Sequence, residues 1–230
     1  MMTDAEQKKL VIAIDGPAGA GKSTIAAHLA RKLDYINLES GAMYRALALK
    51  AIENDISVGD GAALLRLAGH SRIELEPTRE GNRVLLDGRD VSSRIREVDV
   101  TQAASRVSTH PEVRELMVER QREMGTQGGV IMEGRDIGTV VFPNAEVKIF
   151  LDADQSVRAG RRIVQHHAGD DPTLAEKLTA ELQERDRRDS TRTASPLVPA
   201  PDAIHIDSTG LTIAEVIAAA EHIIEERLKR

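Results

Sequence analysis

Cysteine and tryptophan are absent from this chain of 230 residues, and phenylalanine and tyrosine each occur only twice. Without cysteine the protein can form no disulfide, thiolate metal site or cysteine nucleophile, which fits a reducing compartment. With so few aromatic rings, the core must rest on Leu, Ile, Val and Ala. The same shortage argues against a protein that binds single-stranded nucleic acid by stacking its bases.

An excess of positive charge is also missing, because the formal net charge is −6 at pH 7. No global basic field therefore draws the protein to a nucleic-acid polymer or an anionic membrane. No apolar run approaches the length of a membrane span, and residues 1–9 lack the apolar segment of a signal peptide. These features predict a cytoplasmic monomer without nucleic-acid or membrane partners, in which residues 1–9 form a mobile tail.

A glycine-rich segment follows the apolar run Leu10–Ile14 and Asp15. Its pattern is G-x-x-x-x-G-K-[ST], that of a phosphate-binding P-loop. Glycines let backbone N–H groups turn towards phosphate oxygens, and the helix that follows adds the positive end of its dipole. In such loops the lysine bridges β- and γ-phosphates and the hydroxyl binds Mg²⁺. The predicted triphosphate site consists of Gly16, Pro17, Ala18, Gly19, Ala20, Gly21, Lys22, Ser23 and Thr24.

Strand-like and helix-like patterns alternate along most of the chain. Short apolar runs predict strands at 10–15, 35–38, 130–132, 147–151 and 203–207. Helical spacing or capping predicts helices at 22–33, 40–54, 62–68, 98–107, 112–124, 154–167, 173–190 and 212–230. Such alternation around a P-loop predicts an α/β protein of the three-layer P-loop NTPase fold, with a parallel five-stranded sheet flanked by helices.

Residues 56–96 depart from this alternation. Residues 73–76 alternate between apolar and polar, 77–82 are turn-like, and 83–86 and 89–91 are again strand-like. This pattern predicts two or three short antiparallel strands joined by hairpins. We therefore expect an insertion that carries a small antiparallel sheet.

Arginines gather in three stretches, Ser40–Arg45, Glu133–Asp136 and Glu184–Arg192. Ligands of parallel sheets bind at the carboxyl ends of strands, where the first two stretches are predicted to lie. Because arginine binds phosphate bidentately and keeps its charge, a site for a triphosphate and a second phosphate needs such residues. The run at 184–192, taken alone, is more typical of a solvated, salt-bridged helix face. Arg135, directly after a buried strand, is predicted to be functional.

Two other patterns do not support a site. His166 and His167 are adjacent, so on a helix they do not share a face, and no third metal ligand lies nearby. Residues 207–210 match the D-x-x-G pattern of GTPases loosely, but the chain has no Asn-Lys-x-Asp guanine motif. From the residues alone, the open alternatives are a kinase for a nucleoside monophosphate or small alcohol, and a nucleotide-switched binding protein.

Several blocks taken together resemble the bacterial cytidylate kinases, nearly from end to end. Besides the P-loop, they are Glu39–Arg45, Gly134–Pro143, Val147–Ala153 and Glu184–Arg192, with 196–197 and 207–209. The block GRDIGTVVFP is far more specific than a P-loop alone. The resemblance implies transfer of the γ-phosphate of ATP to CMP or dCMP, giving CDP or dCDP, with Mg²⁺ as cofactor. UMP or another nucleoside monophosphate remains the alternative acceptor.

The resemblance also implies where the acceptor binds. The monophosphate-binding region is expected at 41–127, including the insertion at 56–96, while the core is expected at 10–40, 128–157 and 193–230. The implied residues are Arg45, Arg135 and Arg192 for the CMP phosphate, Ser105, Arg114 and Asp136 for the cytosine edge, Ser40 and Tyr44 for the pocket wall, and Arg185 and Asp189 for the sugar.

The remaining implied roles concern ATP and catalysis. A mobile lid at 158–192 is expected to close over ATP, with Arg158, Arg161 and Arg162 facing its phosphates. Asp15 and Ser23 are the predicted Mg²⁺ ligands, and Glu133 stands where the family more often has Asp. The predicted catalytic residues are Lys22, Arg135, Arg162 and Arg192.

Overall fold

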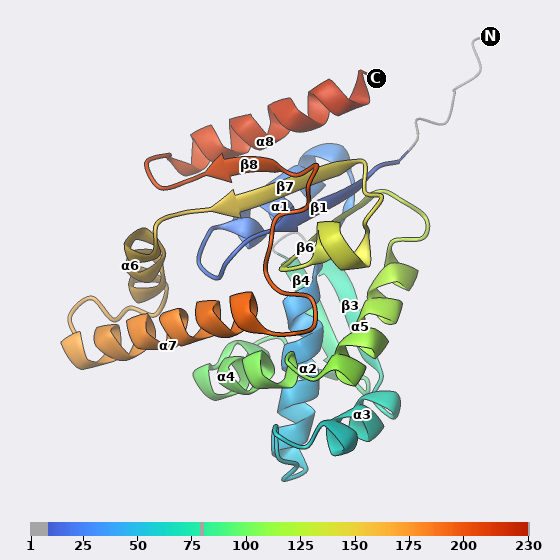
Figure 1. The fold of residues 1–230 in the computed structure, drawn as a ribbon, viewed down its shortest axis with the longest axis vertical. Helices are drawn as coiled ribbons and strands as arrows, with labels where there is room; N and C mark the ends of the chain where they lie inside the picture. Colours follow the sequence, from blue (N-terminus) through green and yellow to red (C-terminus); the bar gives the residue numbers. More distant parts are fainter. Residues whose placement is uncertain (1–8, 79–80, 230) are drawn as a thin grey trace.

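The computed structural model describes residues 9–78 and 81–229 and is built on a five-stranded sheet (Figure 1). Neighbouring strands are parallel, which confirms the predicted sheet. Most of the predicted N-terminal tail, residues 1–8, lies outside the described residues. Across the sheet the strands are β2 (Ile36–Glu39), β6 (Val130–Gly134), β1 (Val11–Asp15), β7 (Val147–Asp152) and β8 (Ile204–Asp207).

Helices cover both faces of the sheet, and the alternating side chains of the central strand β1 explain why. Ile12 and Ile14 pack on one face with α1 (Lys22–Leu33) and α8 (Ile213–Leu228). Ala13 points to the other face, towards α5 (Pro111–Met124). A strand buried on both faces is apolar at successive positions, which is the pattern of a parallel strand. The predicted three-layer architecture is therefore confirmed.

A second hydrophobic cluster lies beyond the edge of the sheet, below it in Figure 1. Its elements include a three-stranded antiparallel sheet, as predicted from the alternation at 73–91. The predicted turn at 77–82 includes residues 79–80, which lie outside the described part. The elements are α2 (Ser40–Glu53), α3 (Gly61–Gly69), β3 (Ile73–Thr78), β4 (Gly81–Leu86), β5 (Arg89–Asp90), a 3-10 turn (Arg94–Arg96), α4 (Val98–Val107) and α5.

The side chain of Asn82 joins this small sheet to the edge strand β2. Its amide nitrogen donates to the carbonyl of Asn37 over 2.6 Å, and its oxygen accepts from the backbone N–H of Glu39 over 2.9 Å. Asn82 is buried. Both bonds satisfy backbone groups that an edge strand leaves open. The small sheet is thus attached next to Glu39, at the end of β2 where α2 begins.

The C-terminal part completes the third layer and adds two helices that lie apart from the sheet. They are α6 (Gln155–Gln165) and α7 (Pro172–Thr191), at the left of Figure 1. A single π-helical turn, Ile137–Val141, follows β6 where the sequence predicted no element. Asp60 and Thr212 cap the N-termini of α3 and α8, because their side chains accept from backbone N–H groups. None of the described helices has the length and apolar character needed to cross a membrane.

Candidate active site

The P-loop leaves the sheet at the carboxyl end of the central strand β1. Gly16 has φ 146°, and a Cβ at this position would lie 1.9 Å from the carbonyl oxygen of Leu151. Gly21 has φ 101° and directly precedes α1. Only glycine adopts such backbone without strain, so the loop needs glycine where it leaves the strand and where it enters the helix.

Lys22, the first residue of α1, is buried within the loop. Its Nζ donates to the carbonyl oxygen of Pro17 over 2.7 Å. Burial, with the nearby cation of Arg135, lowers the pKa of Lys22 to about 7. A group of anionic phosphates next to this side chain would favour its charged form.

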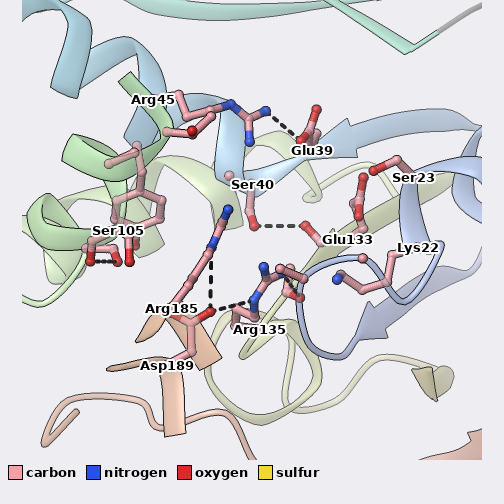
Figure 2. Close-up of a pocket in the computed structure, with 18 of the residues that line it drawn as sticks. Lys22, Ser23, Glu39, Ser40, Arg45, Ser105, Glu133, Arg135, Arg185 and Asp189 are labelled. Carbon is pink, nitrogen blue, oxygen red and sulfur yellow. Dashed lines mark hydrogen bonds and ion pairs between the residues drawn. The ribbon is translucent and has the colours of Figure 1, made fainter. Parts of the chain in front are cut away.

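A central cavity of about 390 Å³ joins the P-loop to α2, α4, α5, β6 and α7 (Figure 2). Among the described residues that line it, cationic side chains outnumber carboxylates two to one. Although the whole chain is acidic, this cavity is positive and suits an anionic ligand. The cations are Lys22, Arg45, Arg96, Arg114, Arg135, Arg162, Arg185 and Arg192, and the carboxylates are Glu39, Glu133, Asp136 and Asp189.

The carboxylate of Asp189 on α7 organises three of these arginines. It accepts from Nε of Arg135 over 2.9 Å and lies 4.0 Å from Nε of Arg185 (Figure 2). It also lies 3.8 Å from a guanidinium nitrogen of Arg192. Burial by itself would raise the pKa of Asp189, but the three arginines outweigh it and hold that pKa below its usual value. The charged Asp189 therefore fixes guanidinium groups that come from two separate elements.

A buried ion pair between Arg114 on α5 and Asp136 after β6 forms the far wall of the central cavity. The Arg114 guanidinium also lies 5.5 Å from the ring centroid of Tyr44 and donates to the Ser108 carbonyl. Burial raises the pKa of Tyr44 to about 12, so the phenol stays neutral. This wall presents a guanidinium donor beside a carboxylate acceptor. Ser105 lines the same cavity and accepts from Arg188 over 2.8 Å.

Two charged residues of the central cavity, Glu39 and Arg96, were not predicted from the sequence as site residues. The Glu39 carboxylate pairs with Arg45 over 2.5 Å, and Arg96 of the 3-10 turn lies 3.6 Å from its second oxygen. The Ser40 hydroxyl, next along the chain, donates to the Glu133 carbonyl over 2.8 Å. The position of Glu39 at the end of a predicted strand is a signal that could have found it. No comparable signal marks Arg96.

A second cavity lies on the other side of the P-loop, and we call it the P-loop cavity. Residues 19–25 line it together with Arg161, Arg162 and Gln165 of α6 and Leu211, Ile213 and Val216 near α8. Arg162 lines both this cavity and the central one. Within the described part of the chain, its guanidinium has no hydrogen bond or ion pair. The predicted catalytic Arg162 thus stands between the two halves of the site.

Arg158 and Arg161 were predicted to face the phosphates of ATP, and both contact the backbone of the P-loop. Arg158 is buried and donates to the carbonyls of Ala153 and Ala18 and to the Asp186 carboxylate. Arg161 donates to the Ala20 carbonyl over 3.3 Å and to Ser208. Arg158 therefore braces the P-loop through backbone carbonyls and does not line either cavity, and Arg161 lines the P-loop cavity with its guanidinium already engaged.

Asp15, predicted as a Mg²⁺ ligand, makes two hydrogen bonds to backbone N–H groups. Its two carboxylate oxygens accept from the backbone N–H groups of Ile137 and Gly138 over 2.8 and 2.7 Å. Burial raises its pKa to about 6, and these hydrogen bonds oppose the rise. Both oxygens are thus committed to the turn after β6.

The Ser23 hydroxyl and the Glu133 carboxylate lie side by side in the central cavity (Figure 2). Burial and neighbouring Glu39 raise the pKa of Glu133 above its usual value, although Lys22 and the Ser23 hydroxyl oppose the rise. Among the described residues, no group of three or more His, Asp or Glu side chains is able to hold a metal ion on its own. Mg²⁺ is commonly held by one or two protein oxygens together with substrate phosphates, and Ser23 with Glu133 fits that donor set.

Comparison with known proteins agrees with this geometry. A protein-family model for cytidylate kinase matches residues 12–226. The cytidylate kinases of Geobacillus thermodenitrificans and Solibacter usitatus are 50% and 49% identical to this chain. These matches cover 96% and 99% of this chain, and 99% and 97% of the relatives.

Solved structures with low sequence identity share the fold. A gluconokinase from Sinorhizobium meliloti is 14% identical, with a TM-score of 0.50 over 97% of this chain and 96% of its own. At that identity the likeness supports the P-loop kinase fold and nothing finer. The family model and the two full-length relatives carry the assignment: the chain belongs to the cytidylate kinase family.

Proposed function

We propose that this chain transfers the γ-phosphate of ATP to CMP or dCMP, giving ADP and CDP or dCDP. The observation that carries the proposal is that Lys22 of the P-loop and the acceptor arginines line one cavity. A P-loop alone binds a triphosphate in switches, motors and kinases alike. A second cluster of arginines facing the same lysine suits a second anionic substrate, and family membership identifies that substrate class.

The Arg114–Asp136 pair supplies a physical basis for cytosine recognition. The cytosine edge carries an amino donor next to acceptor atoms, so it complements a carboxylate acceptor beside a guanidinium donor. Uracil has an acceptor in place of the amino group, which would face the Asp136 carboxylate. Ser105, Ser40 and Tyr44 complete the pocket wall.

The remaining acceptor contacts follow from the arrangement around Asp189. Arg45, Arg135 and Arg192 hold the CMP phosphate, while Arg185 and Asp189 hold the sugar. Within the described residues, Nε of Arg185 and Nη2 of Arg192 are buried without a hydrogen-bond partner. Such atoms are costly to bury unless they are satisfied, and phosphate or sugar oxygens would satisfy them.

Catalysis requires positioning and charge stabilisation more than proton transfer. A nucleoside monophosphate already carries an anionic oxygen at pH 7, so its attack on the γ-phosphorus needs no strong base. Lys22 and Arg162 hold charge on the transferred group, and Arg162 is placed where the two cavities meet. Mg²⁺, when bound with ATP, supplies further charge neutralisation at the phosphate oxygens. Ser23 and Glu133 are the residues that would hold it.

We propose that α6 and α7 form the lid within residues 158–192. Closure over ATP would exclude water, which otherwise hydrolyses a bound triphosphate. Contacts between α7 and α4 join the lid to the acceptor region, through Glu181 with Gln102 and Arg188 with Ser105. The limits of the core and of the 41–127 region, the cytoplasmic location and the monomeric state stay predictions from the sequence.

Initial rates with different acceptors test the proposed function. At a fixed ATP concentration we expect CMP and dCMP to be phosphorylated, UMP more slowly, and AMP least. The ratio of kcat/KM for CMP and dCMP gives the sugar preference. A faster reaction with AMP than with CMP would contradict cytosine recognition.

Binding of ATP to the free protein should take up a proton at Lys22. At pH 8 a lysine with a pKa near 7 is mostly neutral, and contact with the triphosphate restores its charge, so we expect uptake approaching about one proton per ATP. Titration calorimetry in buffers of different ionisation enthalpy measures this number. Lys22→Met, which cannot titrate, is the control. Equal proton uptake by the two proteins would contradict the prediction.

A further inference from the structure

We infer that Asp15 is a positioning residue for acceptor recognition, because its carboxylate holds the turn that carries Asp136. The residue would thereby fix the position of the Arg114–Asp136 pair relative to the P-loop. This inference rests on the proposed function, since it concerns the residues that read the acceptor base.

The carboxylate of Asp15, at the end of β1, binds the segment that follows the neighbouring strand β6. Asp15 is the last residue of β1 and pairs in register with Gly134, the last residue of β6. Its side chain is buried, and each of its two oxygens accepts one backbone N–H, from Ile137 and Gly138. Because each carboxylate oxygen accepts from a different backbone N–H, the two hydrogen bonds together fix both the position and the orientation of the turn.

The two N–H groups that Asp15 binds lie at the start of the π-helical turn, Ile137–Val141. The first N–H groups of a helical segment have no partner inside it, and here Asp15 supplies that partner. The packing is close: a Cβ on Gly138 would lie 3.4 Å from the second Asp15 oxygen and 3.1 Å from Cδ of Lys148. The start of the turn is therefore fixed from β1.

Asp136 immediately precedes these two residues, so its backbone is fixed by the same contacts. Its side chain forms the buried pair with Arg114 and lies 4.0 Å from Nη2 of Arg192. Asp15 is bonded directly to Gly16, the first residue of the P-loop. One carboxylate thus fixes the base-reading pair relative to the loop that binds the donor phosphates.

Asp15→Asn tests the inference with little change in size. Its NH₂ group would face one of the two backbone N–H groups, so the turn must shift. We expect KM for CMP to rise between about tenfold and a hundredfold, KM for ATP to change less than about twofold, and the preference for CMP over UMP to narrow. A merely structural role would lower the melting temperature without moving that preference.

Lys148→Met is the matched control. Lys148 Nζ donates to the Pro143 carbonyl over 2.6 Å and pairs with Asp202, so its ammonium group braces the far end of the same segment. Its stem packs near Gly138, and methionine keeps a stem of similar size. We expect its CMP:UMP preference to stay that of the wild type, even at an equal loss of melting temperature. If Asp15→Asn does not fold, Asp15→Glu keeps the charge but displaces both oxygens from the two N–H groups, and it should narrow the preference in the same direction.

Three results would overturn the inference. They are a folded Asp15→Asn with wild-type CMP kinetics, an equal loss of the CMP:UMP preference in Lys148→Met, and a rise in KM for ATP in Asp15→Asn as large as that for CMP. Wild-type rates measured alongside keep the two proposals apart. If the wild type favours another monophosphate over CMP, the proposed function fails. The positioning role is then tested by whether Asp15→Asn reduces the preference for that other acceptor over the remaining monophosphates.

Discussion

Replacing Lys22 with alanine is expected to lower kcat by about a thousandfold at saturating ATP and CMP, the size of effect seen when one preorganised charge is removed from a dry site. The ammonium group is buried in the loop within reach of the Pro17 carbonyl, and no other cation of the P-loop can replace it. Most of the loss should appear in kcat, because negative charge develops on the oxygen between the β- and γ-phosphates only as the bond to the γ-phosphorus breaks. A coupled assay for ADP measures it.

Lys32→Ala is the control for this variant. Lys32 lies on the same helix, but it is half-exposed and pairs with Glu221 on the outer surface. Surface ion pairs contribute little to stability, and this one is remote from both cavities, so wild-type kcat is expected. An unchanged kcat in Lys22→Ala would refute the role given to its charge.

Replacing Arg114 with alanine should weaken CMP far more than ATP. Loss of the guanidinium removes a donor to the base, worth about 1–3 kcal/mol or roughly ten- to hundredfold in KM for CMP. It also leaves Asp136 buried without its partner, which typically costs about 3–5 kcal/mol of folding stability. Steady-state kinetics and urea unfolding measure the two effects separately.

Arg120→Ala separates base recognition from helix packing. Arg120 lies on α5 like Arg114, but it donates to the carbonyls of Ala68 and Ser71, away from the cavities. Its replacement should lower stability while leaving KM for CMP unchanged. Equal rises in KM for CMP and ATP in Arg114→Ala would instead assign that residue a structural role.

Hydrophobic periodicity was sufficient to predict the layers of this fold. The continuous apolar run before Asp15 indicated a strand buried on both faces, and the alternation at 73–76 indicated the small antiparallel sheet. Element ends moved by one or two residues. For example, the second strand extends to Glu39, because Glu39 pairs in register with Glu133 of β6.

The roles of individual charged side chains were harder to predict, because residue type gives a charge but not its partner. Arg158 and Arg162 lie one helical turn apart on α6, yet only Arg162 lines the two cavities. Arg158 donates instead to the carbonyl of Ala18, which is far away in the sequence. Asp15 is a similar case, since its partners Ile137 and Gly138 come from across the sheet. Such side-chain contacts to distant backbone have no sequence pattern.

Release of ADP with and without CMP tests most directly whether this is a two-substrate site. The central cavity brings the P-loop lysine and the acceptor arginines together, so we expect ATP consumption to depend on the acceptor. With ATP and Mg²⁺ alone, ADP should form only slowly, and adding CMP should start rapid ADP release with an equal amount of CDP. ADP release at the same rate without CMP would contradict the account and favour a nucleotide-switched binding protein.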